Sequence, residues 1–164
     1  MTLDRIDLRI LDVLQKDAAL STAEVAQRVG LSQSPCWRRI AQLEQRGVIR
    51  RRVALLDRAQ LGLDVLVIVH IKLAGHGWQS LPKFKQQVHD FPEVIQCFTM
   101  MGDTDFQLLV ATRTIADYNE FLQKRLVQIA GVQVVDSRIV LEETKNTTEW
   151  PLELAEQGSP GHGG

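Results

Sequence analysis

Two helical patterns lie close together in the first fifty residues, and the connection between them is very short. The first begins with the capping-box pair Ser21 and Glu24, and Gly30 supplies a stop. The second begins at a serine within the next few residues, tolerates Pro35 in its first turn and covers about 32–45. A short helix followed by a tight turn and a basic helix is typical of a helix-turn-helix. An amphipathic pattern at 3–14 predicts one more helix before the pair.

The helix at 32–45 divides into two faces at 100° per residue. Cys36, Ile40 and Leu43 fall on one side and are expected in the core. Trp37 lies at the border between the faces. The opposite face is rich in long hydrogen-bonding side chains, as a helix in a DNA major groove requires, and comprises Ser34, Arg38, Ala41, Gln42 and Gln45. An ordinary solvated face is the alternative for the helix taken alone.

Charge is distributed unevenly along the chain. Eight arginines but only two acids lie between Arg28 and Arg58. Residues 1–60 carry 11 Lys or Arg against 7 Asp or Glu, whereas residues 61–164 carry 8 against 13. This asymmetry favours two domains, with the basic one facing a polyanion. After the basic helix, residues 48–57 are expected to form a short hairpin, or wing, that brings Arg50, Arg51 and Arg52 near the sugar-phosphate backbone.

The rest of the chain alternates strand and helix patterns. A β-branched run at 65–73 predicts a strand, and a turn at 102–105 separates two later strands. The predicted order is strand 65–73, helix 81–90, strand 94–101, strand 106–112, helix 115–128 and strand 132–141. This is the βαββαβ order of a ferredoxin-like domain. The fold class is therefore α+β, with a winged helix-turn-helix followed by a ferredoxin-like domain.

That order has a consequence for assembly. Both helices cover one face of the sheet, yet the strands at 65–69 and 106–111 are apolar on both faces. A monomer would expose a larger apolar patch than a soluble protein normally tolerates. We therefore expect a homodimer packed through the sheets, which would also pair two DNA-reading helices over a pseudo-palindromic site in double-stranded DNA.

Several classes of protein are disfavoured by composition. No apolar run is long enough to span a membrane, and no secretion signal is visible, so a cytoplasmic protein is expected. Cys36 and Cys97 are far apart, which argues against a disulfide framework. The four histidines show no ligand spacing, so neither a metal nor a cofactor is expected. An enzyme is disfavoured because the adjacent Glu142 and Glu143 would point to opposite faces of a strand.

The sequence resembles the Lrp/AsnC family of leucine-responsive, or feast/famine, regulators over residues 3 to about 152. The resemblance is carried, in order, by "LDRIDLRILDVLQKDA", "VGLSQSPCWRRIAQLEQRGVI", "VALLD", "GDTDFQLLV" and "EETKNTTEWPLEL". It implies a transcriptional regulator of amino-acid metabolism or transport, controlled by a small effector that is commonly an amino acid. It also implies dimers that assemble to tetramers or octamers. A global, nucleoid-like DNA organiser of the same family is the alternative function.

The resemblance also assigns residues to sites. The DNA contacts it implies are Gln33, Ser34, Trp37, Arg38 and Arg39, to which the residue pattern adds Gln42, Arg50, Arg51 and Arg52. The effector loop it implies is Met101, Gly102, Asp103, Thr104 and Asp105, together with Arg138, Ile139 and Val140 of the last strand. An aspartate would accept hydrogen bonds from an α-ammonium group, and backbone N–H groups near Gly102 would hold a carboxylate. A plain polar turn is the alternative for this loop.

The domain boundaries expected from these patterns are a DNA-binding domain at 1–57 and a hinge at 58–64. An effector-binding and oligomerisation domain follows at 65–152. The Gly-rich end, 153–164, is expected to be a flexible tail.

Overall fold

The computed structural model describes residues 3–74 and 81–156. These residues form two compact units, each with its own core. Residues 3–55 and 145–156 build the first unit, and the described residues between 56 and 144 build the second. Among the described residues, no helix is both long and apolar enough to cross a membrane.

The first unit is a bundle of three helices, α1 (Arg5–Lys16), α2 (Thr22–Val29) and α3 (Gln33–Gln45). The predicted capping box at the start of α2 is present, because the Ser21 hydroxyl accepts from the backbone of Glu24 and the Glu24 side chain accepts from the backbone of Ser21. Gly30 ends α2 at φ 72°, a left-handed conformation that favours glycine. Their shared core includes Ile10, Val25 and Ile40. The expected helix-turn-helix is therefore confirmed.

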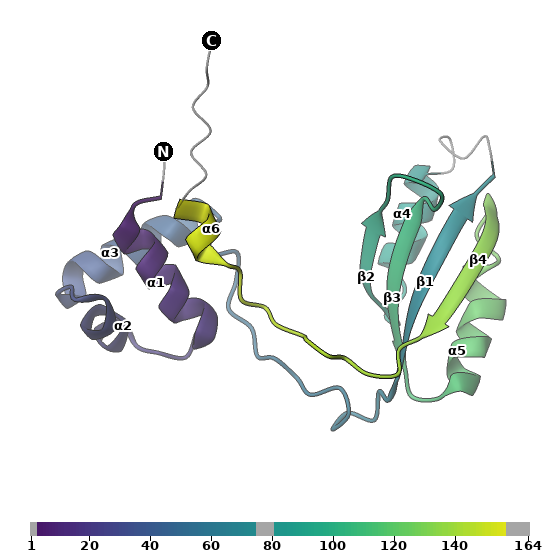
Figure 1. Ribbon diagram of the computed structural model, residues 1–164, viewed down its shortest axis with the longest axis horizontal. Coiled ribbons are helices and arrows are strands. Elements are labelled where there is room, and N and C mark those ends of the chain that lie inside the picture. The colour runs from purple at the N-terminus through teal and green to yellow at the C-terminus, as the bar shows by residue number, and fades with distance from the viewer. Residues whose placement is uncertain (1–2, 75–80, 157–164) are drawn as a thin grey trace, which may run out of the picture. The chain divides into compact units, whose positions relative to one another are not determined.

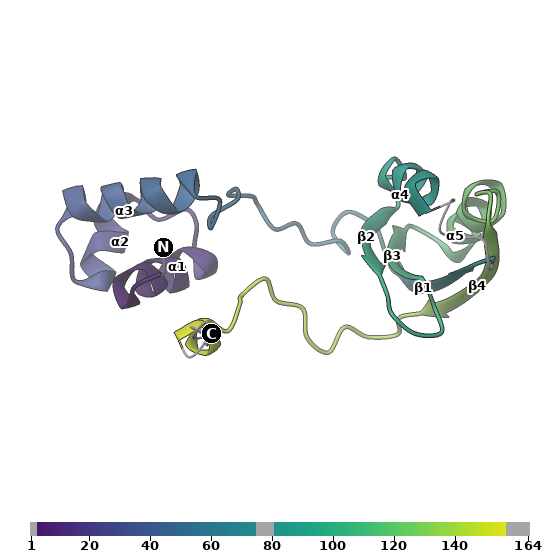
Figure 2. The same ribbon diagram turned by 90° about the horizontal axis from the view of Figure 1, so that it is seen from above.

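The second unit is one antiparallel sheet with helices on one side. Its strands are β1 (Val65–Leu73), β2 (Val94–Thr99), β3 (Phe106–Thr112) and β4 (Val132–Ile139), and its helices are α4 (Leu81–His89), α5 (Ile115–Phe121) and the π-helical continuation η2 (Leu122–Leu126). The strand order β2-β3-β1-β4 is visible in Figure 1. Figure 2 shows α4 and α5 on the same face of the sheet. The βαββαβ prediction is confirmed.

Side chains alternate between the two faces of each strand, and those on one face fill the space between the sheet and these helices. Val67, Val69 and Ile71 of β1 are fully buried, as are Phe106 and Leu108 of β3. They join Phe84 and Val88 of α4, and Tyr118 and Phe121 of α5, in one apolar cluster. The opposite face of the sheet carries no helix among the described residues.

The wing predicted at 48–57 is not formed. Within the described part of the chain, these residues adopt no strand and pair with no other strand. Sequence chemistry accounts for this, because a hairpin needs turn-forming residues between its arms and "VIRRRVAL" contains no Gly, Asn, Asp or Pro. Three consecutive arginines at its centre add like-charge repulsion.

The C-terminal segment also differs from the predicted boundaries. Residues 145–156 group with the first unit instead of the sheet domain. The Gln15 side chain donates to the carbonyl of Trp150 (3.2 Å) and accepts from its backbone N–H (2.9 Å). A short helix, α6 (Leu152–Glu156), then contacts α1, so the first residues of the predicted flexible tail are helical. Residues 157–164 of that tail lie outside the described residues.

Candidate DNA-binding surface and ligand loop

The orientation of α3 follows from which of its residues are buried. Cys36, Ile40 and Leu43 are buried in the core of the first unit, as their spacing predicts. The remaining faces of α3 must therefore point away from α1 and α2. Ser32 is the N-cap residue, and its side chain makes no capping hydrogen bond. The N-terminal turn of α3 thus keeps backbone N–H groups available, and such groups favour an anion.

Most of the predicted DNA contacts on α3 lie on its exposed surface. Gln33, Ser34, Trp37, Arg38 and Gln42 are all exposed, and the Trp37 ring is 62% exposed. A large aromatic side chain left in solvent on a basic helix has no packing role in this unit. A hollow of about 610 Å³ runs beside them and is lined by Asp4, Asp7, Leu31, Pro35, Arg38, Arg39, Gln42, Gln45 and Arg46.

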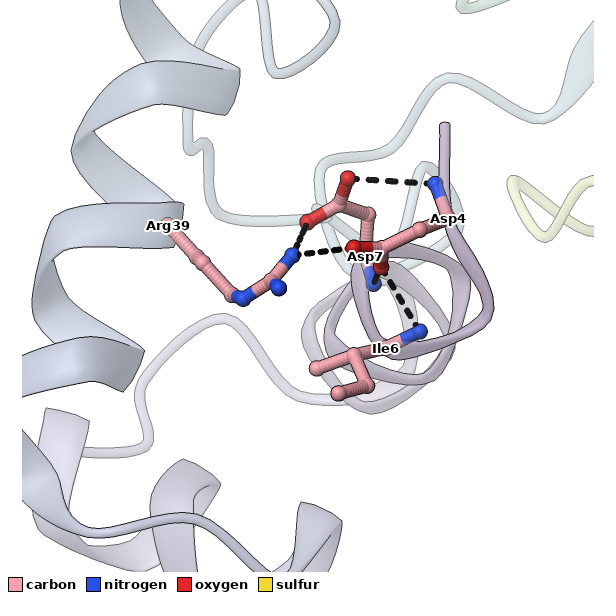
Figure 3. Close-up of polar contacts among 4 residues, drawn as sticks. All are labelled: Asp4, Ile6, Asp7 and Arg39. Atoms are coloured by element: carbon pink, nitrogen blue, oxygen red, sulfur yellow. Dashed lines mark hydrogen bonds and ion pairs between the residues drawn. The ribbon is translucent and has the colours of Figure 1, made fainter. Parts of the chain in front are cut away.

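Arg39 differs from its neighbours. Its Nη1 atom donates to Asp4 Oδ2 and to Asp7 Oδ1, both at 2.7 Å (Figure 3). These hydrogen bonds hold the pKa of the Arg39 guanidinium above its ordinary value. The pKa of Asp4 is lowered, first by the hydrogen bond from the backbone of Asp7 and also by Arg39. The structure therefore places this predicted DNA contact in an ion-pair cluster with α1.

The three consecutive arginines follow α3 in extended backbone. Arg50 and Arg51 are exposed. Arg52 pairs with Glu44 (3.1 Å) and donates to the carbonyl of Ala18 (3.4 Å). One of the three is thus tied to the helical unit, which fixes the start of the segment that leaves it.

The loop between β2 and β3 gives its two aspartates different environments. Asp105 is engaged with β1, since its carboxylate accepts from the backbone of Leu73 (2.7 Å) and its own N–H donates to Ile71 (2.9 Å). Its carbonyl also accepts from Met100 (2.8 Å). Asp103 is exposed, and no side chain or backbone group among the described residues bonds its carboxylate.

The tip of this loop is open to solvent. Met101 is 101% exposed, and Gly102 adopts φ 126°, a conformation that favours glycine. A Cβ atom added at Gly102 would meet nothing within 4 Å, so the conformational requirement comes from φ alone. Thr104 is half-buried beside the anchored Asp105. The loop therefore presents Asp103 and the backbone near Gly102 on a rigid base.

The other predicted effector residues lie at the far end of the sheet. Ile139 pairs with Val67 of β1, whereas the loop between β2 and β3 lies beside the other end of β1, near Ile71. Four residues of strand separate these positions, which is about 13 Å. Arg138 bonds Asp136 (2.8 and 3.0 Å), and the N–H of Val140 donates to Leu66. One chain alone does not bring Arg138, Ile139 and Val140 to the loop.

The helix-free face of the sheet is apolar at its centre. Ile68 of β1 lies beside Leu109 of β3, and both are only half-buried. Phe98 of β2 is adjacent and exposed. Towards β4 the face turns polar, with His70 Nδ1 4.0 Å from Asp136 Oδ2. This is the apolar second face that the strand sequences predict.

The described residues include neither a cluster placed to hold a metal ion nor a cysteine with a lowered pKa. No group of three or more His, Cys, Asp or Glu among them is placed to hold a metal ion. Burial raises the pKa of the Cys36 thiol, and burial likewise raises that of Cys97. A raised thiol pKa is the opposite of what an activated nucleophile needs.

The residues that sequence reasoning missed are Asp4 and Asp7. They form a capping box at the start of α1, and both bind Arg39. The spacing of the two aspartates before an apolar run is a capping pattern that the sequence does contain. Their pairing with an arginine more than thirty residues away has no local sequence signature.

Comparison with known proteins gives consistent matches over both units. Residues 3–50 match a family model described as a winged helix-turn-helix DNA-binding domain, and residues 66–150 match the Lrp/AsnC ligand binding domain. The glutamate uptake regulatory protein of Zymomonas mobilis is 41% identical over 150 residues, covering 92% of this chain and 91% of that protein. The Bkd operon transcriptional regulator of Pseudomonas aeruginosa is 37% identical, covering 92% and 98%.

Two solved structures are also similar. An AsnC family transcriptional regulator from Agrobacterium tumefaciens is 43% identical, with a TM-score of 0.88 over 93% of this chain and 99% of that one. A transcriptional regulator from Neisseria meningitidis, solved in complex with L-methionine, is 35% identical, with a TM-score of 0.89 over 93% and 99%.

Proposed function

Since the chain belongs to the Lrp/AsnC family of DNA-binding transcriptional regulators, we propose that it reads a pseudo-palindromic promoter site through α3 and responds to an amino acid. The observation that carries the first part is the division of α3. Its buried stripe fixes the helix in the first unit, and its exposed surface presents Arg38 and Gln42 side by side, with Trp37 at the border. Arginine and glutamine make bidentate contacts with base edges in the major groove.

The other residues predicted to bind DNA are better placed to contact the phosphate backbone of DNA than its bases. Ser34 and Gln33 lie in the first turn of α3, where backbone N–H groups favour a phosphate. Arg50 and Arg51 are exposed in the extended segment after the helix, as phosphate contacts require. We leave Arg39 out of the base-contacting set because Asp4 and Asp7 both bind its guanidinium.

Assembly through the helix-free sheet face completes the proposal. Ile68, Leu109 and Phe98 form an apolar surface that a second copy of the same face would cover. Two-fold pairing of this kind gives the assembly two copies of the DNA-reading helix, one for each half of a pseudo-palindromic site. Arg138, Ile139 and Val140 lie far from the loop within one chain, so any shared effector site requires more than one copy. Tetramers or octamers of such dimers fit this requirement.

The proposed dimer predicts the effect of one added charge. Leu109→Glu should convert the dimer to monomer at micromolar concentration, because a carboxylate at the centre of an apolar interface is buried without a partner. Sedimentation velocity measures the change. Gln123→Glu adds the same charge on the helix-covered side and should leave the dimer intact. A wild-type protein that sediments as a monomer, or a Leu109→Glu dimer, would contradict this assembly.

The effector is a small molecule that binds the sheet unit, and we propose that it is an amino acid. Two features of the loop support this choice, namely an unengaged carboxylate on Asp103 and a glycine backbone at φ 126° beside it. The first would accept from an α-ammonium group, and the second offers N–H groups to an α-carboxylate. The methionine complex of the Neisseria relative gives the same ligand class. A thermal-shift screen against the twenty amino acids identifies the ligand, since a molecule that binds only the folded state raises Tm.

Asp103→Ala should abolish the effect of that amino acid on DNA binding. The substitution removes an exposed acid without touching the hydrogen bonds of Asp105, so basal DNA affinity should stay within about twofold of wild type. Fluorescence anisotropy with and without the amino acid measures both quantities. Asp90→Ala, which removes another exposed acid of the same unit, should keep the full response. A persistent response in Asp103→Ala would show that the loop is not the ammonium site.

A further inference from the structure

Arg39 sits between two carboxylates that are already held by the backbone of α1. Asp4 uses Oδ1 to accept from the N–H groups of Ile6 (2.9 Å) and Asp7 (2.8 Å), and it uses Oδ2 to bind Arg39. Asp7 uses Oδ2 to accept from the N–H of Asp4 (3.2 Å), and it uses Oδ1 to bind Arg39. Each carboxylate therefore caps α1 with one oxygen and holds α3 with the other (Figure 3).

We propose that Arg39 is a positioning residue for DNA sequence recognition, which locks the rotation and tilt of α3 against the N-terminus of α1 through Asp4 and Asp7. The inference rests on the proposed function of α3 as the DNA-reading helix. Arg39 acts through the exposed side chains of α3, above all Arg38 and Gln42, and it does not itself touch DNA. Asp4 and Asp7 are thereby assigned a part in recognition although they lie on another helix.

The geometry argues against a direct DNA contact by Arg39. Its side chain is 30% exposed, and that of Asp7 is only 12% exposed. Swinging the guanidinium out to a phosphate would leave Asp7 charged, largely buried and without its cation. The acids also place negative charge beside the hollow along α3. Arg39 offsets part of that charge, which would otherwise repel the phosphate backbone.

Arg39, Asp4 and Asp7 form a clamp between α3 and the start of α1. This clamp is rigid because its two carboxylates are already held in place by backbone N–H groups before Arg39 binds them. Backbone N–H groups of α1 fix both carboxylates at a helix N-terminus, where the helix dipole also favours negative charge. Arg39 therefore meets two oriented acceptors, and the two carboxylates lose little further freedom when they bind it. By contrast, the apolar contact of α3 rests on Cys36, Ile40 and Leu43, which form one narrow stripe. The bonds of Arg39 to Asp4 and Asp7 lie about 60° away from this stripe around the helix axis and therefore add a second point of attachment.

Small rotations matter for reading bases. A rotation of about 10° moves a point at the helix surface, about 5–6 Å from the axis, by about 1 Å. Hydrogen bonds to base edges span only about 2.7–3.2 Å and weaken steeply outside that range. Phosphate contacts depend far less on such alignment, because they are carried largely by charge. Loss of the clamp should therefore reduce specific binding much more than non-specific binding.

The test uses the full-length protein and two duplexes, a site selected by the wild type from a random-sequence pool and a scrambled site of equal length. Binding is measured by fluorescence anisotropy over a salt series, for Arg39→Gln and for Asp7→Asn. Asp7→Asn is decisive because it removes the charge of the more buried acid of the clamp and leaves every side chain of α3 in place. Asp12→Asn is the matched control, since it breaks the ion pair between Asp12 and Lys16 within α1 (2.8 Å) and leaves the clamp intact.

Both clamp variants should bind the selected site at least about tenfold more weakly and the scrambled site within about threefold of wild type. The slope of log K against log salt should stay within about half a unit of wild type, because no phosphate contact is lost. Arg39→Lys keeps the charge and should recover part of the discrimination. Asp12→Asn should match wild type on both duplexes. Thermal unfolding by circular dichroism sets a working temperature at which all variants are folded.

Two results would overturn the inference. Asp7→Asn with wild-type discrimination would show that α1 does not position α3. Arg39→Gln with equal losses on both duplexes and a slope reduced by about one would show a phosphate contact instead. If Arg39→Gln proves unfolded, Asp7→Asn and Arg39→Lys decide by the same criteria. A wild type that does not distinguish the duplexes would refute the proposed function itself, before any variant is compared.

Discussion

Arg38→Ala is expected to weaken binding of the full-length protein to its selected DNA site by about 5- to 150-fold. This range corresponds to the ~1–3 kcal/mol that one bidentate contact to a base contributes. Arg38 is exposed on α3 directly opposite the buried stripe, so its guanidinium is free to reach a guanine edge. No shift of its backbone is expected, because alanine is the better helix former.

The same variant should lose sequence preference at one or two base pairs while binding other DNA nearly as before. Anisotropy titrations against a panel of single-base substitutions measure this directly. Arg9→Ala removes the same charge from the exposed surface of α1 and serves as the control. If Arg38→Ala and Arg9→Ala lose the same DNA affinity and the base preferences stay unchanged, Arg38 contributes only its charge and does not contact a base.

Phe106→Ala is expected to destabilise the sheet unit by about 3–5 kcal/mol. Phe106 is fully buried on β3, and its ring stacks on Phe84 of α4 with centroids 4.4 Å apart. Removing the ring leaves a cavity between the sheet and a helix that can close only by moving α4. Urea unfolding followed by far-ultraviolet circular dichroism measures the free energy of unfolding.

Two comparisons sharpen this test. Ile115→Ala truncates an exposed apolar side chain of the same unit and should change the free energy of unfolding by less than about 0.5 kcal/mol. The apolar clusters of the two units share no residue, so amide exchange in α1–α3 should change much less than in β1 and β3. A Phe106→Ala protein as stable as Ile115→Ala would mean that this cluster is not the core of the sheet unit.

Local chemistry made most of the helical unit predictable. A serine–glutamate capping box and a glycine stop define α2, and the spacing of Cys36, Ile40 and Leu43 identifies the buried side of α3. These features depend on residues a few positions apart. Arg39 is the exception. The family resemblance implies that it contacts DNA, whereas the structure pairs it with Asp4 and Asp7 at the start of α1. At 100° per residue Arg39 lies about 60° from Cys36, beside the core face, which was the available hint.

The sheet unit was predictable in order but not in register. Strand and helix patterns fix βαββαβ, yet they do not say which aspartate of the loop faces β1. The pairing of Ile71 with Phe106 brings Asp105 to the backbone of Leu73 and leaves Asp103 outside. The register of β4 likewise carries Arg138, Ile139 and Val140 away from the loop. The predicted wing is not formed for a local reason, since residues 48–55 contain no residue that favours a hairpin turn.

Sequence-specific reading by α3 is tested most directly by one competition experiment on the wild-type chain. Full-length protein bound to its selected site is challenged with unlabelled selected and scrambled duplexes at about 0.15 M salt. The account predicts that at least about a thousandfold more scrambled DNA is needed for equal displacement. Equal competition by the two duplexes would contradict it and would identify a DNA organiser that covers DNA without reading its sequence.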